Sequence, residues 1–175
     1  DLSRNSIGSN VGVEGVSMSQ DAGKEMLTAL FVAIGELTRL ETLVLDENEL
    51  NQISCLHQLR NLRKLSLKGN KLRTLPNEMG VLKTLNDLVL SDNLLTRLPR
   101  HLEGLSAIQR LDVKGNDIAT LPDAIGTLST LKVLDISENK RLRELPRTME
   151  ALSKDIKLLI SPAMRALVAT PYQVV

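Results

Sequence analysis

Few residues in this chain have the types and spacing that catalysis or nucleotide binding requires. Gly23, Lys24 and Glu25 suggest the end of a phosphate-binding loop, whose backbone N–H groups surround a nucleotide phosphate. That motif needs Gly at position 18 and Ser or Thr at position 25, whereas the chain has Met18 and Glu25. The sequence therefore predicts a helix start at this point and no nucleotide site.

Thiol and imidazole groups are too sparse to predict a metal site. Cys55 is the only cysteine, and His57 and His101 are the only histidines. A zinc site would need a second Cys-His pair, and a cysteine nucleophile would need a base that the fold places beside it. Carboxylates are plentiful, but the sequence predicts no closed pocket in which paired acids could act. We therefore predict no catalytic residue, no metal, no cofactor and no small-molecule substrate.

Composition excludes further classes of protein. The chain has 175 residues, which suits one domain, and 42% of them are hydrophobic, more than a disordered chain contains. A net charge of +1 and only two aromatic residues argue against nucleic-acid binding, which uses basic surfaces and stacked rings. No apolar run is long enough to span a membrane. A single cysteine and the lack of any N-x-[ST] sequon favour a reducing, cytoplasmic location.

Leucine accounts for 35 of the 175 residues, and most of these leucines fall in one repeated pattern. Five segments follow L-x-x-L-x-L-x-x-N-x-L, with one extra residue in the last: LETLVLDENEL from Leu40, LRKLSLKGNKL from Leu62, LNDLVLSDNLL from Leu85, IQRLDVKGNDI from Ile108 and LKVLDISENKRL from Leu131. The leucines of L-x-L share one face of a strand, so strands of successive repeats can stack in parallel over a continuous core. The sequence predicts an α/β solenoid with a parallel concave sheet and with turns or short helices on the convex side.

The asparagine that follows each strand predicts a structural ladder. Its expected members are Asn5, Asn48, Asn70, Asn93, Asn116 and Asn139. A buried asparagine side chain can donate to and accept from backbone groups at the end of a strand. Replacing one by alanine should leave backbone groups unpaired, at a cost of about 1–3 kcal/mol.

The segments that lead from one strand to the next also repeat, as LRTLP, LTRLP, IATLP and LRELP. Proline cannot donate to a sheet, so it ends extended pairing and begins the outer limb of the repeat. Together the two patterns resemble the leucine-rich repeat family. The 23-residue L-P type resembles the intracellular repeats of Ras-pathway scaffolds and plant Ras-group proteins. The limb LNQISCLHQLRNL lacks the proline and resembles the 22-residue variant of phosphatase-regulatory repeat proteins.

Residues 1–39 are predicted to form a partial first repeat with an insertion. In DLSRNSI, Leu2, Asn5 and Ile7 match the second half of a repeat, so we expect the chain to begin inside a repeat of a longer protein. Residues 8–20, rich in Gly and Ser, are predicted as an inserted loop.

Residues 21–36 are predicted as a helix that begins with Asp21 as its N-cap. Its apolar face would contain Met26, Leu27, Leu30, Phe31 and Ile34. This longer limb resembles the ribonuclease-inhibitor-like class of repeats. At the other end, residues 155–175 are predicted as a C-terminal cap, with a last strand in DIKLLI and a short helix in PAMRALVAT. We expect residues 1–175 to form a single domain.

Side chains that alternate with the core leucines should lie on the concave face, and their net charge changes sign from strand to strand. The predicted partner-binding residues are Glu41, Asp46, Arg63, Lys64, Lys68, Asp87, Asp92, Arg110, Lys114, Lys132 and Glu138. Opposite charges on neighbouring strands can pair with each other, or they can meet a partner with a complementary pattern. The sequence leaves both interpretations open. With no aromatic anchor on this face, Arg63 and Arg110 are the expected strongest contacts.

The resemblance implies a non-catalytic protein-protein interaction module. We expect it to bind a protein partner through the concave face, as a scaffold or signalling segment of a larger intracellular protein or assembly, with no membrane contact. One alternative is a structural subunit of a large stable complex of ribosomal or ciliary type. Another is the substrate-recognition segment of a larger enzyme such as a ubiquitin ligase. The fold alone cannot decide between them, because function in such repeats lies in the surface.

Overall fold

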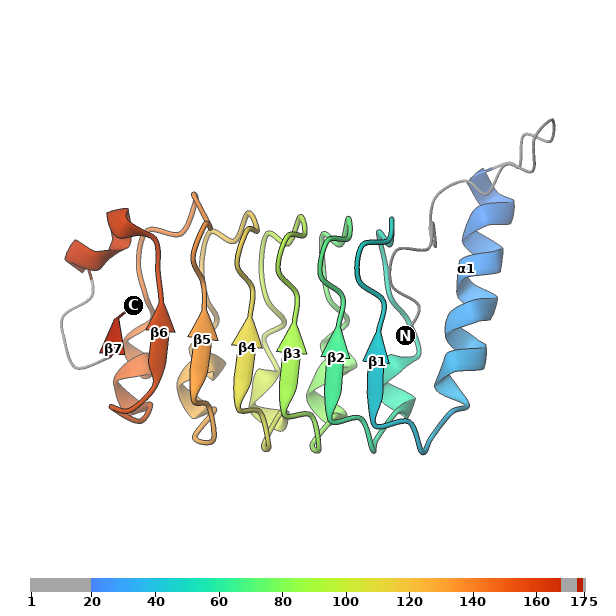
Figure 1. Ribbon diagram of the computed structural model, residues 1–175, viewed down its shortest axis with the longest axis horizontal. Coiled ribbons are helices and arrows are strands. Elements are labelled where there is room, and N and C mark those ends of the chain that lie inside the picture. The colour runs from blue at the N-terminus through green and yellow to red at the C-terminus, as the bar shows by residue number, and fades with distance from the viewer. Residues whose placement is uncertain (1–19, 168–172, 175) are drawn as a thin grey trace.

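The chain winds as a solenoid in which each strand is followed by a limb that returns behind the sheet (Figure 1). The computed structural model describes residues 20–167 and 173–174. A helix, α1, stands at the N-terminal end of a row of strands. The strands form one parallel seven-stranded sheet in chain order, β1 to β7.

The strands are short because each of β1 to β5 contains only the three residues x-L-x in the middle of L-x-x-L-x-L. They are β1 Thr42–Val44, β2 Lys64–Ser66, β3 Asp87–Val89, β4 Arg110–Asp112, β5 Val133–Asp135, β6 Lys157–Leu159 and β7 Gln173–Val174. The limbs carry 3-10 helices: η1 Leu56–Gln58, η2 Asn77–Val81, η3 Leu102–Gly104, η4 Asp123–Thr127, η5 Arg147–Ala151 and η6 Pro162–Leu167. The solenoid with a parallel sheet and short helices behind it confirms the fold class predicted from the repeats.

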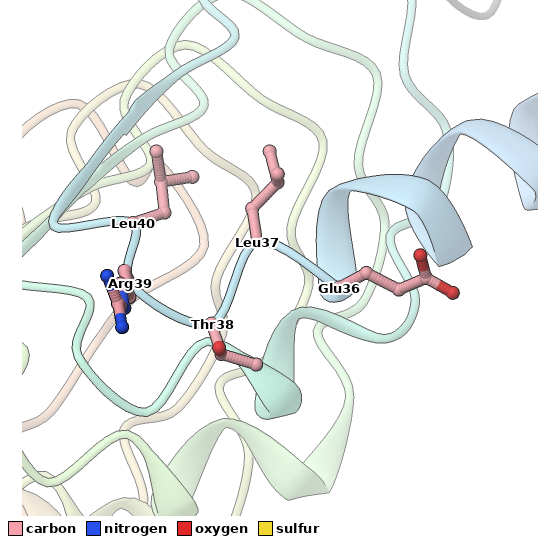
Figure 2. Close-up of a pocket in the computed structure, with 5 residues that line it drawn as sticks. All are labelled: Glu36, Leu37, Thr38, Arg39 and Leu40. Carbon is pink, nitrogen blue, oxygen red and sulfur yellow. The ribbon is translucent and has the colours of Figure 1, made fainter.

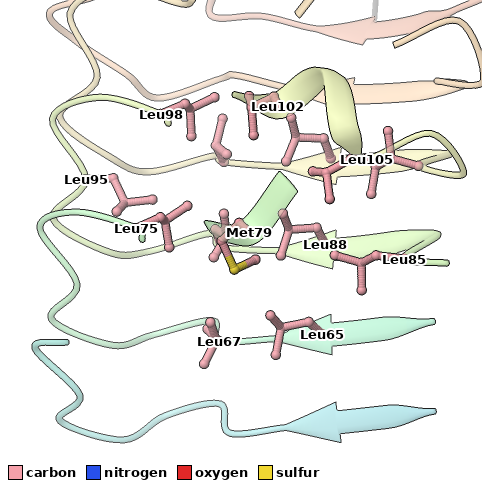
Figure 3. Packing of buried hydrophobic residues seen from close by; sticks show 14 of the residues in the cluster. Leu65, Leu67, Leu75, Met79, Leu85, Leu88, Leu95, Leu98, Leu102 and Leu105 are labelled. Carbon is pink, nitrogen blue, oxygen red and sulfur yellow. The ribbon is translucent and has the colours of Figure 1, made fainter. Parts of the chain in front are cut away.

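The core is a stack of aliphatic side chains between the sheet and the limbs (Figure 3). Leu65 of β2 pairs in register with Leu43 and Leu88 of the adjacent strands, and all three side chains are buried. Each repeat thus adds the same layer of leucines to its neighbour, which joins the separate apolar faces into one continuous core. This stacking explains why leucine is so abundant and aromatic side chains are nearly absent.

Three of the limbs turn into their 3-10 helices directly after the proline of L-P. Pro76, Pro122 and Pro146 have extended backbones with φ between −72° and −64°, and each precedes the first helical residue. The fixed φ of proline and its missing N–H suit this change from extended chain to turn. The η3 limb differs, because its helix begins at Leu102, after His101.

The N-terminal helix α1 spans Gln20–Gly35, close to the range 21–36 that was predicted. Asp21 was predicted as its N-cap, and this is wrong: the helical backbone already includes Gln20, so Asp21 lies inside the first turn. Phe31 and Ile34 are buried against the first repeat. The predictions for Leu2, Asn5 and Ile7, and for the inserted loop up to residue 19, lie outside the described residues.

At the C-terminal end the predicted strand in DIKLLI is β6, and the sheet continues into β7 through the pair Lys157 and Gln173. Leu158 and Ile160 are buried, as is Met164 of η6. The helix expected in PAMRALVAT is a 3-10 helix that ends at Leu167, and residues 168–170 lie outside the described part of the chain.

Candidate functional site

The concave side of the sheet brings charged side chains of successive repeats next to one another. Thr42 lies in register with Lys64, Lys64 with Asp87, Asp87 with Arg110 and Arg110 with Val133. Because neighbouring strands are about 4.8 Å apart, side chains at the same repeat position come within reach of each other. Side chains that are one repeat apart in the sequence therefore lie next to each other on this face.

Nine of the eleven predicted binding residues form ion pairs with one another. The pairs are Glu41–Arg63 (3.4 Å), Lys64–Asp87 (3.9 Å), Asp87–Arg110 (3.9 Å), Lys68–Asp92 (3.8 Å) and Lys114–Glu138 (3.1 Å). Each pair joins two neighbouring repeats. The side chains remain 42–64% exposed, apart from Asp87 at 26%. The internal pairing of alternating charges is thus present, and it leaves most of these groups within reach of a partner.

The other two predicted residues, Asp46 and Lys132, have different surroundings. Oδ1 of Asp46 accepts hydrogen bonds from the Ser66 hydroxyl at 2.6 Å and from the Lys68 N–H at 2.9 Å. Lys132 is exposed, and no ion pair of its side chain occurs within residues 20–167. It lines an open groove of about 490 Å³ at the start of β5, together with Gln109 and Asp155. Lys132 is therefore available to an incoming anionic group.

Asp87 is the most shielded member of the paired set. Its carboxylate lies between Lys64 and Arg110. Oδ2 is 3.9 Å from Nζ of Lys64, and Oδ1 is 3.9 Å from Nη1 of Arg110. Its Oδ1 atom is buried and has no hydrogen-bond partner within the described part of the chain. A buried oxygen without a hydrogen bond is costly in free energy, and the long ion pairs on both sides offset that cost only in part.

Asp112, which the sequence reading did not select, is the buried acid of this face. It is 7% exposed and accepts a 2.9 Å hydrogen bond from Arg110. Burial raises the pKa of the Asp112 carboxyl above its ordinary value, and the nearby Asp135 carboxylate raises it further, against hydrogen bonds from the Lys114 N–H and Arg110. The signal was available in the repeat alignment, since Asp112 and Asp135 occupy the same register position on adjacent strands.

The residue before each ladder asparagine also alternates from repeat to repeat, between an acid and a glycine. All five of these residues have a left-handed backbone: Glu47, Gly69, Asp92, Gly115 and Glu138, with φ between 53° and 66°. Acidic side chains and glycines alternate in this series. A Cβ at Gly69 would lie 2.7 Å from Oε1 of Glu47, and one at Gly115 would lie 2.5 Å from Oδ1 of Asp92. The glycine of one repeat thus makes room for the carboxylate of the repeat before it.

The lysines that precede the two glycines complete this arrangement. Lys68 precedes Gly69 and pairs with Asp92 of the next repeat, while Lys114 precedes Gly115 and pairs with Glu138. The hydrogen bond and charge of Glu138 raise the pKa of the Lys114 amine. Each Lys-Gly repeat therefore contacts an acidic repeat on both sides.

The asparagine ladder runs across the sheet at the ends of the strands, one residue after these left-handed positions. The Asn70 amide donates to the carbonyls of Leu45 and Leu67, both at 2.9 Å, and its Oδ1 atom accepts from the Leu50 N–H at 3.0 Å. The same contacts recur in the next three repeats through Asn93, Asn116 and Asn139, and Asn48 donates to Leu45. Asn5 lies outside the described residues. The ladder holds the turns on which the alternating acids and glycines sit.

The other residues that could do chemistry lie apart from each other. Cys55 is half-buried before η1, His57 lies exposed within η1, and His101 contacts Glu103 at 3.2 Å on a later limb. Among residues 20–167 and 173–174, no group of three or more His, Cys, Asp or Glu side chains could hold a metal ion. No helix in that same part of the chain has the length and apolar character to cross a membrane.

A further open pocket, of about 460 Å³, lies along the connection between α1 and β1. Its lining comes from the single segment of residues 36–40, and Figure 2 shows Leu37 and Leu40 on the same side of that segment while Glu36 points away. Leu37 is 54% exposed. The polar groups do not converge on one point, so this pocket offers no catalytic arrangement.

Comparison with known proteins agrees with the repeat geometry. The family model described as leucine rich repeat matches residues 60–118. A leucine-rich repeat protein of Leptospira interrogans is 38% identical, with a TM-score of 0.68 over 73% of this chain and 32% of that chain. The chain belongs to the leucine-rich repeat family.

A second solved structure is more distant in sequence. The plant peptide hormone receptor RGFR1, in complex with RGF2, is 28% identical with a TM-score of 0.61, over 73% of this chain and 25% of that one. The chain thus spans about a third of one compared protein and a quarter of the other. Leucine-rich repeat domains typically bind protein partners and are generally non-catalytic, which agrees with the interaction module expected from the sequence.

Proposed function

We propose that this chain is a non-catalytic protein-interaction module that binds a protein partner through the concave face of its sheet. The observation that carries the proposal is the registered pattern of charge along β1 to β5, in which ion-paired side chains stay substantially exposed. Such a pattern can exchange internal partners for external ones at little cost, since exposed pairs contribute only about 0–1 kcal/mol. It therefore favours specificity and register over affinity.

The partner would have acidic and basic groups spaced to match successive strands. Lys132 offers a cation without an internal partner within residues 20–167. Arg63 and Arg110 provide planar guanidinium groups, which bind carboxylates through two N–H donors at once. Half-buried Val44 and Val133 lie on the same face and provide apolar contact between the charges. We expect a folded or extended protein surface rather than a small ligand to satisfy all of these groups.

We further propose a scaffold or regulatory role in the cytoplasm. The support is the resemblance of the L-P repeats to intracellular Ras-pathway scaffolds, together with the single cysteine of the chain. In that setting the module would act as one segment of a larger protein or assembly.

Site-specific crosslinking combined with charge reversal tests the concave surface. A photo-crosslinking residue at Val133 on the concave face should capture the partner in its native cell, whereas one at exposed Thr127 on η4 should not. Lys64→Glu together with Lys68→Glu should then weaken binding of the captured partner by about tenfold. The matched control Lys140→Glu with Lys154→Glu, at exposed limb positions, should leave binding intact.

Two outcomes would contradict the proposal. Capture from Thr127 alone would place the partner on the convex side, and equal weakening by both charge-reversed pairs would indicate a bulk charge effect. Partners recovered at fixed stoichiometry after extensive washing would favour the structural subunit of a stable complex over an exchanging scaffold.

A further inference from the structure

A polar groove lies between two neighbouring L-P limbs, apart from the concave face. It has a volume of about 590 Å³ and is lined by residues 74–78 of one limb and 97–100 of the next. Figure 3 shows Leu75 and Leu98 at one end of the core, away from the strand-side leucines Leu65 and Leu88. The groove is within the size range of pockets that bind ligands.

The groove has a buried floor and exposed walls. Leu75 and Leu98 are 9% and 4% exposed, and Pro99 is buried beside them. The walls carry the exposed side chains of Thr74, Asn77, Glu78, Arg97 and Arg100. Pro76 has an extended backbone, with φ −64° and ψ 143°. Each wall is thus a short run of consecutive residues of one limb, so a peptide segment laid between the two limbs would meet both walls.

Arg97 and Arg100 differ from most cations of the sheet face because they have no ion pair within residues 20–167. They flank Leu98 and Pro99 on one wall, and the only carboxylate that lines the groove is Glu78 on the opposite wall. The side chains therefore leave two guanidinium groups for one internal carboxylate. The groove has an unbalanced positive charge.

This arginine pair occurs in only one of the L-P limbs. The limb before it has Thr74 and Asn77 at the two equivalent positions, and the limb after it has Thr120 and Asp123. The last limb has an arginine at only the second position, Arg147. The groove is thus a local feature of one junction between repeats and not a general property of the solenoid.

We propose that this groove binds an extended acidic peptide segment of a protein partner. Carboxylate side chains of the peptide would accept paired N–H donors from Arg97 and Arg100, while Thr74 and Asn77 offer hydrogen bonds along the other wall. Glu78 would repel a carboxylate at its end, which fixes the acidic residues of the peptide near the arginines. This second surface is independent of the concave site, so one module could hold two partners.

Fluorescence anisotropy with a labelled hexaglutamate peptide tests this surface on the full chain. We expect saturable binding, with amide NMR shifts confined to residues 74–78 and 97–100. Arg97→Glu with Arg100→Glu should weaken the affinity about tenfold or more. The matched control Arg143→Glu with Arg147→Glu makes the same charge change at exposed positions two limbs further on, and it should bind as the unmodified chain does.

Folding and the alternative ligands are checked in the same series. Circular dichroism should show unchanged structure for both variants, and Arg97→Gln with Arg100→Gln supplies a milder change if the reversal unfolds the chain. Lys64→Glu with Lys68→Glu should keep full peptide affinity, which separates this site from the concave proposal. Equal weakening by the control pair, shifts on the concave face, or tighter binding of single-stranded oligothymidylate in the groove would each overturn the proposal.

Discussion

The cations of the sheet face and the two arginines of the limb groove, Arg97 and Arg100, differ in whether a carboxylate pairs with them. On the sheet, Arg63, Lys64 and Lys68 each have a carboxylate of a neighbouring repeat within 3.9 Å. On the limbs, Arg97 and Arg100 have none within residues 20–167. The sheet has a fixed register, so side chains at equal positions must meet, and like charges there would repel. Arg97 and Arg100 lie outside the strands and their register, although other groups beyond the strands do pair, such as Lys71 with Glu49 and Arg141 with Asp117.

Stability and recognition in this module therefore depend on different residues. Registered layers, namely the leucines and the asparagine ladder, hold the repeats together. Charges on the sheet are adjusted to their neighbours first and can serve a partner second. Arg97 and Arg100 have no such neighbour within residues 20–167, so selection for binding can act on them directly. Four measurements test this contrast.

The largest effect is expected from the ladder. Asn70→Ala should lower the free energy of unfolding by about 2–3 kcal/mol, because it leaves the Leu50 N–H without its side-chain partner and removes one of the two amide donors to each of the Leu45 and Leu67 carbonyls. Asn77→Ala, at an exposed limb position, should change it by less than about 0.5 kcal/mol. Urea unfolding of both variants makes the comparison. Similar losses would show that the limbs contribute as much as the registered edge.

The left-handed turn positions should give the next largest effect. Gly69→Ala is expected to cost about 1–2 kcal/mol, because φ is +66° and the new Cβ would contact the Glu47 carboxylate. Glu47→Ala in the same chain should recover part of that loss. A double-mutant cycle measured by thermal unfolding gives the coupling between the two repeats. Strictly additive losses of stability would mean that Gly69 is needed only for its own left-handed conformation and not to make room for Glu47.

An exposed ion pair should matter less. Glu138→Gln removes the carboxylate that lies 3.1 Å from Lys114, and we expect a loss below about 1 kcal/mol. The loss should shrink as salt is added, because screening weakens exposed pairs. Denaturation at low and high ionic strength provides the test. A larger, salt-independent loss would indicate that this pair supports the turn itself.

The smallest effect is a pH dependence at Asp112. Its pKa in the folded chain is raised, first by burial and also by Asp135, so the folded state binds this proton more tightly than the unfolded state does. Stability of the native chain relative to Asp112→Asn should therefore fall as pH rises from about 4 through the raised pKa. Urea titrations across that window measure the difference. A rise with pH would show that the Arg110 contact outweighs burial.

Sequence reasoning could predict whatever depends on repeat register. The spacing of leucines predicted the strands and the core, and alternating charges at equal positions indicated pairs such as Lys64 with Asp87. It could also have found the close carboxylates Asp112 and Asp135, since they align. Conformations that depend on local backbone were harder. The start of α1 was placed one residue late, and the left-handed state of Glu47 has no signal in its own residue type.

The limb groove shows the other limit of sequence reasoning. Arg97 and Arg100 look like ordinary surface arginines in the alignment, because nothing in the repeat pattern states how far apart successive limbs lie. The hollow between residues 74–78 and 97–100 lies between the limbs that contain η2 and η3. Only three-dimensional placement shows that both guanidinium groups line one space.

The alternation of acid and glycine before the ladder asparagines implies that the smallest interchangeable unit of this solenoid is a pair of repeats. Deleting one repeat would bring two acidic turns together, or two glycine turns, and would also bring like charges of the sheet into contact. Deleting two successive repeats would restore the alternation of acid and glycine. A lineage that lengthened or shortened this array without losing its fit would therefore have done so two repeats at a time.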